Sequence, residues 1–437
     1  MCRINLLLAT LCMLAATQLY AQQKDLPEND VINIVLTEQQ AIELALKNNP
    51  NLAQMQARYE AMAKIPSQQG SLPDPIITLG AMSYPTDTFN RDQEAMTQFQ
   101  IGVSQAFPFP GKLGLREEAA EFDAKAAYYA AEEMRLVLAS NVSNKWWQVF
   151  YLDRALDTVD TNHALLRQFI AVAETKYTTG KGLQQDVLLS QLELSRLIDK
   201  KIQIEAMRAN HGIQLNILMD LAPRSALLLP KTSPISRAKI RSEQTLYHLA
   251  ESSRPRLHEK RQLDAAATSR LDLAKREYYP DFNVALTYGD RNGQNPIANG
   301  GDRADLVSLM IGIKIPLYAG TKQSAAVQQR TREKMKSHYS LMDERNQVMA
   351  DIAANITDYQ RAQQQLSLFT TGILPQARQT VQSMLAGYQV SEVDFLNLVR
   401  SQVTLLNYEL QYWKSLTESY QALARLQASI GKESIYE

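Results

Sequence analysis

Cysteine is nearly absent from this 437-residue sequence: Cys2 and Cys12 are the only two, and both lie close to the N-terminus. The segment around them has the pattern of a secretory signal, in which Arg3 precedes an apolar run over residues 6–16 that is too short for a membrane anchor. We therefore predict that residues 1–21 are a signal peptide. The mature chain is then expected to have no disulfide and no thiolate metal site.

An excess of charge of one sign is also missing, because 46 basic residues balance 46 acidic residues. A nucleic-acid partner is therefore not expected, since proteins that bind nucleic acid normally carry a basic face. No stretch after the signal segment reaches the roughly 18 continuous apolar residues of a transmembrane helix. These absences leave three destinations for an exported chain: the periplasm, the medium, or a membrane in which it forms a β-barrel.

Residue clusters that carry chemistry are missing as well. The five histidines are scattered, and the closest pair, His248 and His258, lacks the spacing of a metal site. The sequence contains no nucleophile–base pattern, no glycine-rich phosphate loop and no metal motif. We therefore expect that the protein is not an enzyme and has no catalytic residue, cofactor or bound metal.

Glycine and proline are absent from three long segments, residues 115–179, 321–371 and 391–430. The first segment would form a helix about 98 Å long at a rise of 1.5 Å per residue. Apolar residues recur in these segments at steps of three and four, which predicts coiled-coil-like packing. We place the turns between the helices at the flanking breakers: Gly180 and Gly182 in one half, and Gly372 and Pro375 in the other.

Four sequence features each occur twice, at a spacing of 205 to 208 residues. The matched pairs are Asn49-Pro50 with Arg254-Pro255, Pro73-Asp74 with Pro280-Asp281, Phe107-Pro108 with Ile315-Pro316, and Asp186-Val187-Leu188 with Asp394-Phe395-Leu396. A spacing that drifts so little indicates an internal duplication. We predict a first repeat over residues 22–230 and a second over residues 231–437, each with a helix, a strand pair and two long helices.

The predicted strands, at about 76–84, 97–107, 282–289 and 307–315, alternate between apolar and polar residues, the first less cleanly than the others. Their lengths are close to the 9–11 residues of a tilted membrane strand, and such alternation is typical of a water-filled barrel. We therefore predict that the polar set faces a lumen; it includes Gln98, Gln100, Ser308 and Lys314. An ordinary half-buried periplasmic sheet is the alternative interpretation.

Four strands cannot close a barrel, and an open sheet edge cannot face lipid. The chain must therefore oligomerise if the strands enter a membrane. Three copies would give twelve strands, whereas two would give eight, whose side chains largely fill the interior.

In order and twice over, these features resemble the TolC-type outer-membrane efflux proteins, over residues from about Leu36 to Gly431. The motifs that carry the resemblance are Leu36-Thr37, Ala41, Ala45-Leu46 and Asn49-Pro50; Leu72-Pro73-Asp74-Pro75; Ser104-Gln105-Ala106-Phe107-Pro108-Phe109-Pro110-Gly111-Lys112; Tyr177, Gly180 and Asp186-Val187-Leu188; Tyr278-Tyr279-Pro280-Asp281-Phe282; and Ile315-Pro316-Leu317. The stretch from Phe107 to Lys112 is similar to the branch that accompanies heavy-metal cation pumps.

The resemblance implies a mainly α-helical protein with a small β part. It implies a homotrimer with a twelve-stranded barrel in outer-membrane lipid, continued by a twelve-helix periplasmic tunnel. The expected function is that of a channel-tunnel in a tripartite efflux system. Its partners would be a periplasmic adaptor protein and an inner-membrane pump of the resistance-nodulation-division type. One alternative is a periplasmic coiled-coil structural or adaptor protein. Another is a small-barrel porin or adhesin, which would need at least eight strands in one chain.

The resemblance also assigns roles at the two turns between paired long helices, residues 179–185 and 389–393. It places a channel constriction at Asp394 and Asn397. It places adaptor-docking tips at Gly180, Gly182, Leu183, Asp186 and Ser391. From its position alone, Asp394 could instead be a helix N-cap. The spacing from tyrosine to aspartate is nine residues in the first tip and six in the second, which predicts a second tip about three residues shorter.

Overall fold

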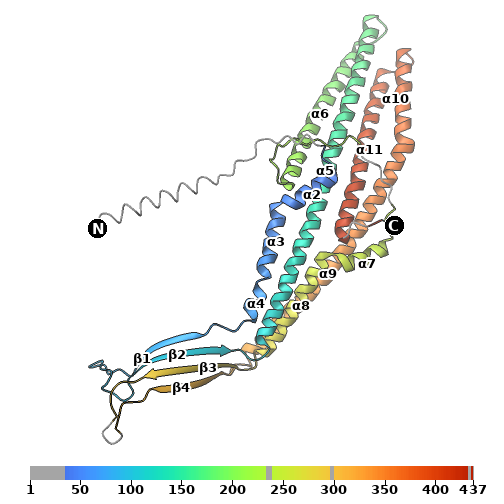
Figure 1. Ribbon diagram of the computed structural model, residues 1–437. Coiled ribbons are helices and arrows are strands. Elements are labelled where there is room, and N and C mark those ends of the chain that lie inside the picture. The colour runs from blue at the N-terminus through green and yellow to red at the C-terminus, as the bar shows by residue number, and fades with distance from the viewer. Residues whose placement is uncertain (1–34, 233–238, 296–299, 432–434, 437) are drawn as a thin grey trace, which may run out of the picture.

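The computed structural model describes residues 35–232, 239–295, 300–431 and 435–436. These residues form an elongated molecule in which a β-sheet lies at one end and the turns of paired helices lie at the other (Figure 1). The predicted signal peptide lies outside the described residues.

Both halves of the chain place short helices before a strand pair and long helices after it. A single helix was predicted before each strand pair, but three helices precede the strands in the first half and two in the second. The first half contains α2 (Glu38–Asn48), α3 (Pro50–Met62), α4 (Ile65–Gly70), β1 (Ile76–Met82), β2 (Gln98–Phe107), α5 (Lys112–Thr178) and α6 (Gln184–Leu218). The second half contains α7 (Glu243–Ser253), α8 (Pro255–Arg276), β3 (Asp281–Asp290), β4 (Leu306–Lys314), α9 (Lys322–Leu368), the π-helix η2 (Phe369–Ile373), α10 (Leu374–Gln389) and α11 (Phe395–Ile430). The strands begin and end within two residues of the predicted positions.

The four strands form one antiparallel sheet in the order β1-β2-β3-β4. The two hairpins have equivalent registers: Ile77 pairs with Val103 in the first, and Val284 pairs with Ile311 in the second. These partners lie 207 and 208 residues apart, which are the spacings of the motifs beside the strands. The duplication therefore extends to the pairing of individual residues in the two hairpins.

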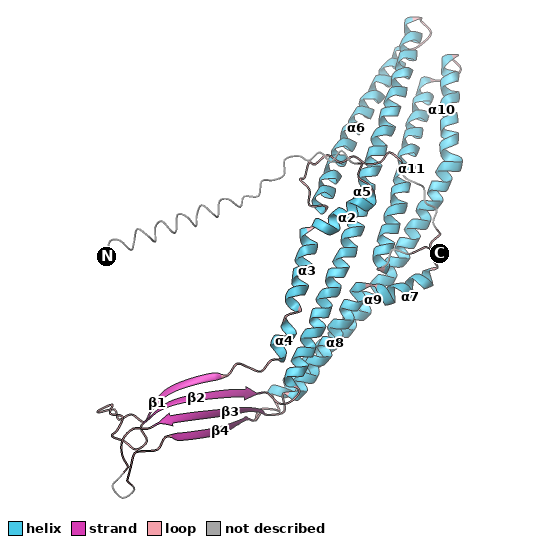
Figure 2. Ribbon diagram, viewed as in Figure 1, coloured by secondary structure: helices cyan, strands magenta, loops and turns pink. Residues whose placement is uncertain are grey.

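One face of the sheet is apolar, because each strand places its apolar set opposite that of its neighbour. Its large side chains, which are between 44 % and 71 % exposed, include Ile77, Leu79, Ile101, Val103, Leu286, Tyr288, Leu309 and Ile311. Figure 2 shows the described sheet extending away from the helices, with no helix packed on either of its faces. This phase agrees with the predicted alternation.

The prediction of a turn at Gly372 and Pro375 is wrong. Both residues lie inside a continuous helical path, where η2 joins α9 to α10 without a break. A π-helical segment accommodates one extra residue in a helix. In agreement, α9, η2 and α10 together have 68 residues, whereas α5, their counterpart in the first repeat, has 67.

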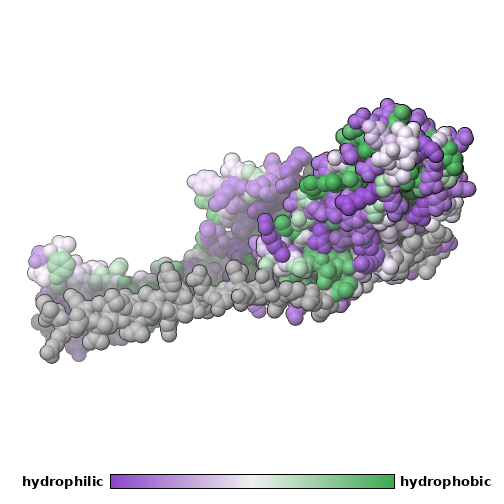
Figure 3. Space-filling view, turned by 90° about the horizontal axis from the view of Figure 1, so that it is seen from above, coloured by the Kyte–Doolittle hydropathy of each residue, from purple (hydrophilic) through white to green (hydrophobic). Residues whose placement is uncertain are grey.

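The long helices pack side by side, so that α5 contacts α8 and α6, and α11 contacts α5 and α9. Their core is a series of apolar clusters along the molecule. In the largest aromatic group, Trp147 stacks on Tyr420 with ring centroids 4.0 Å apart, and the Trp146 indole donates to the Leu36 carbonyl at 3.0 Å. In a view from above, hydrophilic residues cover most of the helical surface and apolar residues form separate patches (Figure 3). None of the helices in the described ranges is both long and apolar enough to span a bilayer.

Candidate functional site

The end of the molecule opposite the sheet consists of two helical turns of the same design (Figure 1). At the first, Gly180 has a φ of 71°, and the Lys181 N–H donates to the Lys176 carbonyl at 2.8 Å. At the second, Ser391 has a φ of 67°, and the Glu392 N–H donates to the Gly387 carbonyl at 2.9 Å. Both ends are Schellman motifs, in which a left-handed residue after the helix lets the chain satisfy free carbonyls.

The two tips have loops of equal length, so the predicted shortening of the second loop is wrong. Five residues separate α5 from α6, and five separate α10 from α11. The difference in spacing arises in the following helix. Asp186 is the third residue of α6, whereas Asp394 precedes α11 as its N-cap residue. The two aspartates, matched in sequence, therefore occupy different positions on their helices.

A polar cluster joins the two tips within one chain, and we call Lys176, Asp186, Tyr388 and Ser391 the tip cluster. The Tyr388 hydroxyl donates to the Asp186 carboxylate at 3.3 Å. The Lys176 ammonium donates to the Ser391 hydroxyl at 3.0 Å and to the Tyr388 carbonyl. It also lies 4.4 Å from the centre of the Tyr388 ring, within the range of a cation–π interaction. The cluster fastens α10 to the first hairpin.

The tip cluster perturbs the acidities of its members. Burial raises the pKa of Asp186; the Tyr388 hydrogen bond opposes this rise, and the charge of Asp394 adds to it. Burial and the nearby Asp186 carboxylate raise the pKa of Tyr388 to about 12. The phenol therefore remains a proton donor at neutral pH, and Asp186 holds its proton more tightly than a free aspartate would.

The predicted constriction residues, Asp394 and Asn397, are both exposed at the start of α11. Asp394 occupies the N-cap position, but its carboxylate accepts no hydrogen bond from the first turn of the helix. The capping alternative therefore lacks the contact that defines a cap. The Asp394 carboxylate is therefore exposed to solvent without a capping contact.

The other predicted tip residues lie beside the tip cluster. Gly182 packs so closely on Lys176 that an added Cβ would lie 2.8 Å from the Lys176 Cβ. Leu183 is 57 % exposed, although it is a large apolar residue. An apolar side chain at the extreme end of an elongated molecule is available for contact with another protein.

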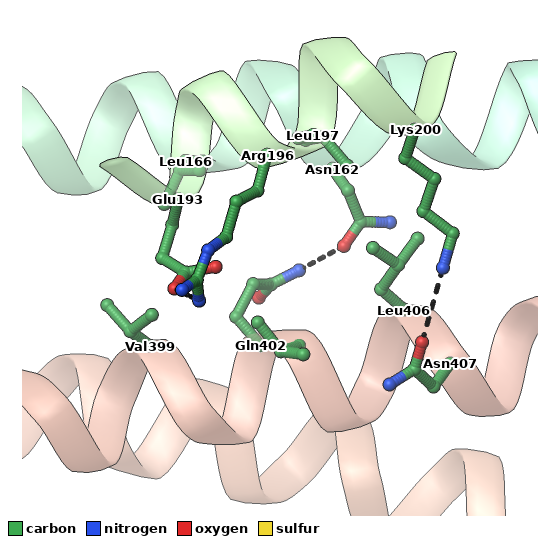
Figure 4. Close-up of a pocket in the computed structure, with 11 residues that line it drawn as sticks. Asn162, Leu166, Glu193, Arg196, Leu197, Lys200, Val399, Gln402, Leu406 and Asn407 are labelled. Carbon is green, nitrogen blue, oxygen red and sulfur yellow. Dashed lines mark hydrogen bonds and ion pairs between the residues drawn. The ribbon is translucent and has the colours of Figure 1, made fainter. Parts of the chain in front are cut away.

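A cleft of about 240 Å³ lies between α5 and α6 on one side and α11 on the other (Figure 4). In its floor, the Gln402 amide donates to the Asn162 side-chain oxygen. At its rim, Lys200 donates to the Asn407 side chain at 3.4 Å, and Arg196 pairs with Glu193 at 2.7 Å. Polar side chains thus surround an apolar wall that includes Leu406.

The residues predicted to line a lumen lie on the polar face of the sheet, away from the tips. Gln100 is paired with Gly80 and Gly289, Ser308 with Thr287, and Lys314 with Asp281. Gln98 lies on the same face and reaches over Gly289. Hydrogen-bonded partners share a face of a sheet, so the sheet brings all four predicted residues to one side.

Sequence reasoning assigned no role to Lys176 or Tyr388, the two residues that connect the tips. The signal for Tyr388 was present, because it lies 211 residues after Tyr177, a residue of the first-repeat motif. Lys176 has no such signal, since its contacts come from the second repeat. Within the described ranges, no group of three His, Cys, Asp or Glu side chains could hold a metal ion.

The family model described as outer membrane efflux protein matches residues 41–219 and 246–432. The fold is similar to that of the outer membrane protein VceC from Vibrio cholerae, with a TM-score of 0.77 and 18 % identity over 90 % of this chain and 96 % of that chain. It is also similar to the CmeC outer membrane channel of Campylobacter jejuni, with a TM-score of 0.72 and 12 % identity over 92 % and 90 % of the two chains. The open state of the Neisseria gonorrhoeae MtrE outer membrane channel gives a TM-score of 0.74 and 12 % identity over 91 % and 89 %. A comparison with curated protein sequences finds no match.

Proposed function

The chain belongs to the outer membrane efflux protein family, and we propose that it is the passive exit duct of a tripartite efflux system. In this proposal, three copies form a twelve-stranded barrel in the outer membrane and a twelve-helix tunnel in the periplasm. A periplasmic adaptor joins the tunnel to an inner-membrane pump of the resistance-nodulation-division type. Membership of the family agrees with the expectation that the chain is not an enzyme.

The uncovered apolar face of the sheet is the observation that carries the proposal. Large apolar side chains such as Leu309 and Ile311 are 68 % and 64 % exposed in the single chain. A continuous apolar face of this kind needs lipid or protein to cover it. The opposite face carries the polar side chains of the sheet, among them Gln100, Ser308 and Lys314, together with the apolar Ile76, Met82 and Met310. Polar side chains on this face suit the water-filled interior of a barrel. A periplasmic structural rod or adaptor would leave this apolar face exposed to water, so the sheet argues against that alternative.

The helices support a tunnel of twelve helices. Beside the sheet, the order of packed helices in one chain is α4, α5, α8 and α9; near the tips it is α6, α5, α11 and α10. Each level therefore supplies four helices, and three copies supply twelve. At 1.5 Å per residue, the 67 residues of α5 extend about 100 Å, which suits a periplasmic conduit.

We place the gate and the adaptor contact at the tip end. Three copies of Asp394 would converge around the axis and favour cations, as acidic rings do in channels. The tip cluster would hold the second hairpin against the first and keep the entrance closed. The cleft between α6 and α11, together with Gly180, Gly182 and Leu183, would receive the adaptor. A passive duct takes its specificity from the pump. Heavy-metal cations are therefore a predicted substrate of the pump and not a property of this chain.

Cell fractionation and gel electrophoresis test the proposal directly. The protein should be recovered in the outer membrane, and unheated samples should migrate as a trimer that heating converts to monomer. Recovery entirely in the soluble periplasm, or a monomer that stays monodisperse in detergent, would contradict the proposal.

A further inference from the structure

Lys112, the first residue of α5, is the one lysine that lies fully buried among the described residues, with 1 % of its side chain exposed. Its ammonium donates to the Asp281 carboxylate at 2.8 Å, to the Tyr279 carbonyl at 2.9 Å and to the Glu277 carboxylate at 3.2 Å. The Phe109 N–H donates to the same Asp281 carboxylate at 2.9 Å. A buried ammonium needs such partners, because an unpaired charge in this position would be strongly destabilising.

These contacts fasten the joint between sheet and helices. Lys112 follows β2 in the first repeat, and Asp281 begins β3 in the second. The joint therefore connects the segment that leaves the strand pair of the first repeat, which we call its outgoing segment, to the segment that enters the strand pair of the second repeat. Phe109 and Tyr279 stack across the same joint, with ring centroids 4.6 Å apart.

The outgoing segment of the second repeat has no such partner within the chain. Lys322 begins α9 as Lys112 begins α5, and Asp74 matches Asp281 at a spacing of 207 residues. Both side chains are exposed, and neither makes an ion pair or a side-chain hydrogen bond with the described residues. The joint between Lys112 and Asp281 is thus complete within one chain. The equivalent residues Lys322 and Asp74 lie at opposite edges of the molecule, so they cannot form a joint with each other in the same chain.

The two edge strands of the sheet likewise lack a pairing partner on one side within the described chain. β2 pairs with β3, whereas β1 and β4 form the edges of the sheet. In the β2–β3 register, Val103 pairs with Leu286. Ile311 lies 208 residues after Val103, and Leu79 lies 207 residues before Leu286. The equivalent register between two copies therefore pairs Ile311 of one copy with Leu79 of the other. This register also aligns the apolar face of β4 with that of β1, whereas a shift of one residue would oppose apolar and polar faces.

We propose that Lys322 of one copy binds Asp74 of a neighbouring copy, in a joint that repeats the Lys112–Asp281 contact, while Ile311 pairs with Leu79. This inference rests on the proposed trimer and names the contacts that close it. An exposed apolar row on α9 lies beside the same edge: Met335, Tyr339 and Met342 are 38 %, 60 % and 51 % exposed. The neighbouring copy's α3 and α4 would cover this row, as α8 covers α5 within one chain.

Disulfide crosslinking tests the inferred register. In a Cys2→Ser, Cys12→Ser background, Leu79→Cys with Ile311→Cys should oxidise to a covalent trimer on a non-reducing gel. Leu79→Cys with Met310→Cys is the matched control, because its two side chains point to opposite faces and should remain uncrosslinked. Light scattering in detergent reports independently whether the protein is a trimer.

The outcomes separate this inference from the proposed function. A trimer in which the test pair crosslinks no better than the control would overturn the register, although the proposed function would stand. A protein with no trimer by light scattering would overturn the proposed function itself.

A charge exchange tests the ion pair. Lys322→Glu should lower the temperature at which the trimer dissociates, and adding Asp74→Lys should restore much of the loss. Lys47→Glu, the same charge change on exposed α2, is the control and should leave that temperature unchanged. A Lys322→Glu trimer as stable as the Lys47→Glu trimer, or an exchange that fails to recover stability, would overturn the pair.

Discussion

The two tips are built on one plan, but only the second has features that suit movement. The first tip ends an uninterrupted helix with glycine in the left-handed position, where glycine adopts it without strain. The second places Ser391 in that conformation, which costs about 1 kcal/mol for a residue with a Cβ. Its helix contains a π-helical segment 16 residues before the tip, from Phe369 to Ile373. Such segments often accompany functional sites.

The two repeats therefore differ in the continuity of their long helices and in the residue at the left-handed position of the tip. The first hairpin is a continuous scaffold, and the second is held to it through Tyr388 and Lys176. We infer that the second hairpin is the part that moves when the entrance opens.

The largest effect is expected in the sheet, where the two repeats should behave alike. Val103 and Ile311 are repeat equivalents on the apolar face. Arginine at either position should destabilise the inserted barrel by about 2–4 kcal/mol near the middle of the membrane and block trimer assembly on unheated gels. Gly312→Ser, on the polar face, should assemble normally. If Ile311→Arg and Gly312→Ser assemble equally well, the assigned faces are wrong.

The second prediction removes the π-helical segment. Deleting Gly372 should convert the segment to regular α-helix and give the second repeat the same helix length as the first. Because the extra residue is absorbed locally, Tyr388 should keep its contact with Asp186. We expect an assembled trimer that opens less often in planar bilayers. Unchanged opening of an assembled trimer would show that the segment does not act as a hinge.

The third prediction concerns ion selectivity. Asp394→Asn removes a charge at the tip without changing the size of the side chain. If three Asp394 carboxylates line the entrance, the substitution should weaken cation preference in planar-bilayer recordings. Asp186→Asn is a useful comparison, since Asp186 is held inside the tip cluster. Unchanged reversal potentials in an assembled Asp394→Asn trimer would place the constriction elsewhere.

The smallest expected effect is a pH dependence of the closed entrance. Burial raises the pKa of Asp186 in the tip cluster above its ordinary value. If the tip cluster holds the entrance closed, the closed state binds the proton more tightly than an open state with a solvated carboxyl group. Its added stability is present below about pH 4 and is lost as pH rises through the raised pKa. Acidification from neutral pH should therefore reduce opening. Asp186→Asn should remove this component, and an unaltered pH profile in that variant would contradict the assignment.

The sequence predicted the strands well because a sheet with one apolar and one polar face imposes a period of two on the side chains. The motif spacings also agree with the equivalent registers of the two hairpins, in which Ile77 pairs with Val103 and Val284 pairs with Ile311. The breakers Gly372 and Pro375 were misleading, because local sequence does not show whether a proline ends a helix or only distorts it. Here Phe369, Leu374 and Val381 pack into the core between the hairpins and keep the helix continuous.

The candidate site was only partly predictable. Gly180 and Asp186 stand in a recognisable motif, and the structure places both at the tip. The link between Lys176 and Tyr388 depends on how two hairpins from different repeats pack together. No local pattern encodes such a contact, and the helical phase of each residue alone does not establish it.

Single-channel recording of two matched tyrosine variants tests whether the second tip holds the gate. Tyr388→Phe removes the hydroxyl that binds Asp186 but keeps the ring against Lys176. Tyr177→Phe removes the equivalent hydroxyl in the first tip, where the side chain is 47 % exposed. The account predicts that Tyr388→Phe trimers open more often or to a larger conductance, by the equivalent of about 1 kcal/mol for one hydrogen bond, whereas Tyr177→Phe trimers behave as the wild type. Equal behaviour of the two variants, or a larger effect of Tyr177→Phe, would contradict a gate held at the second tip.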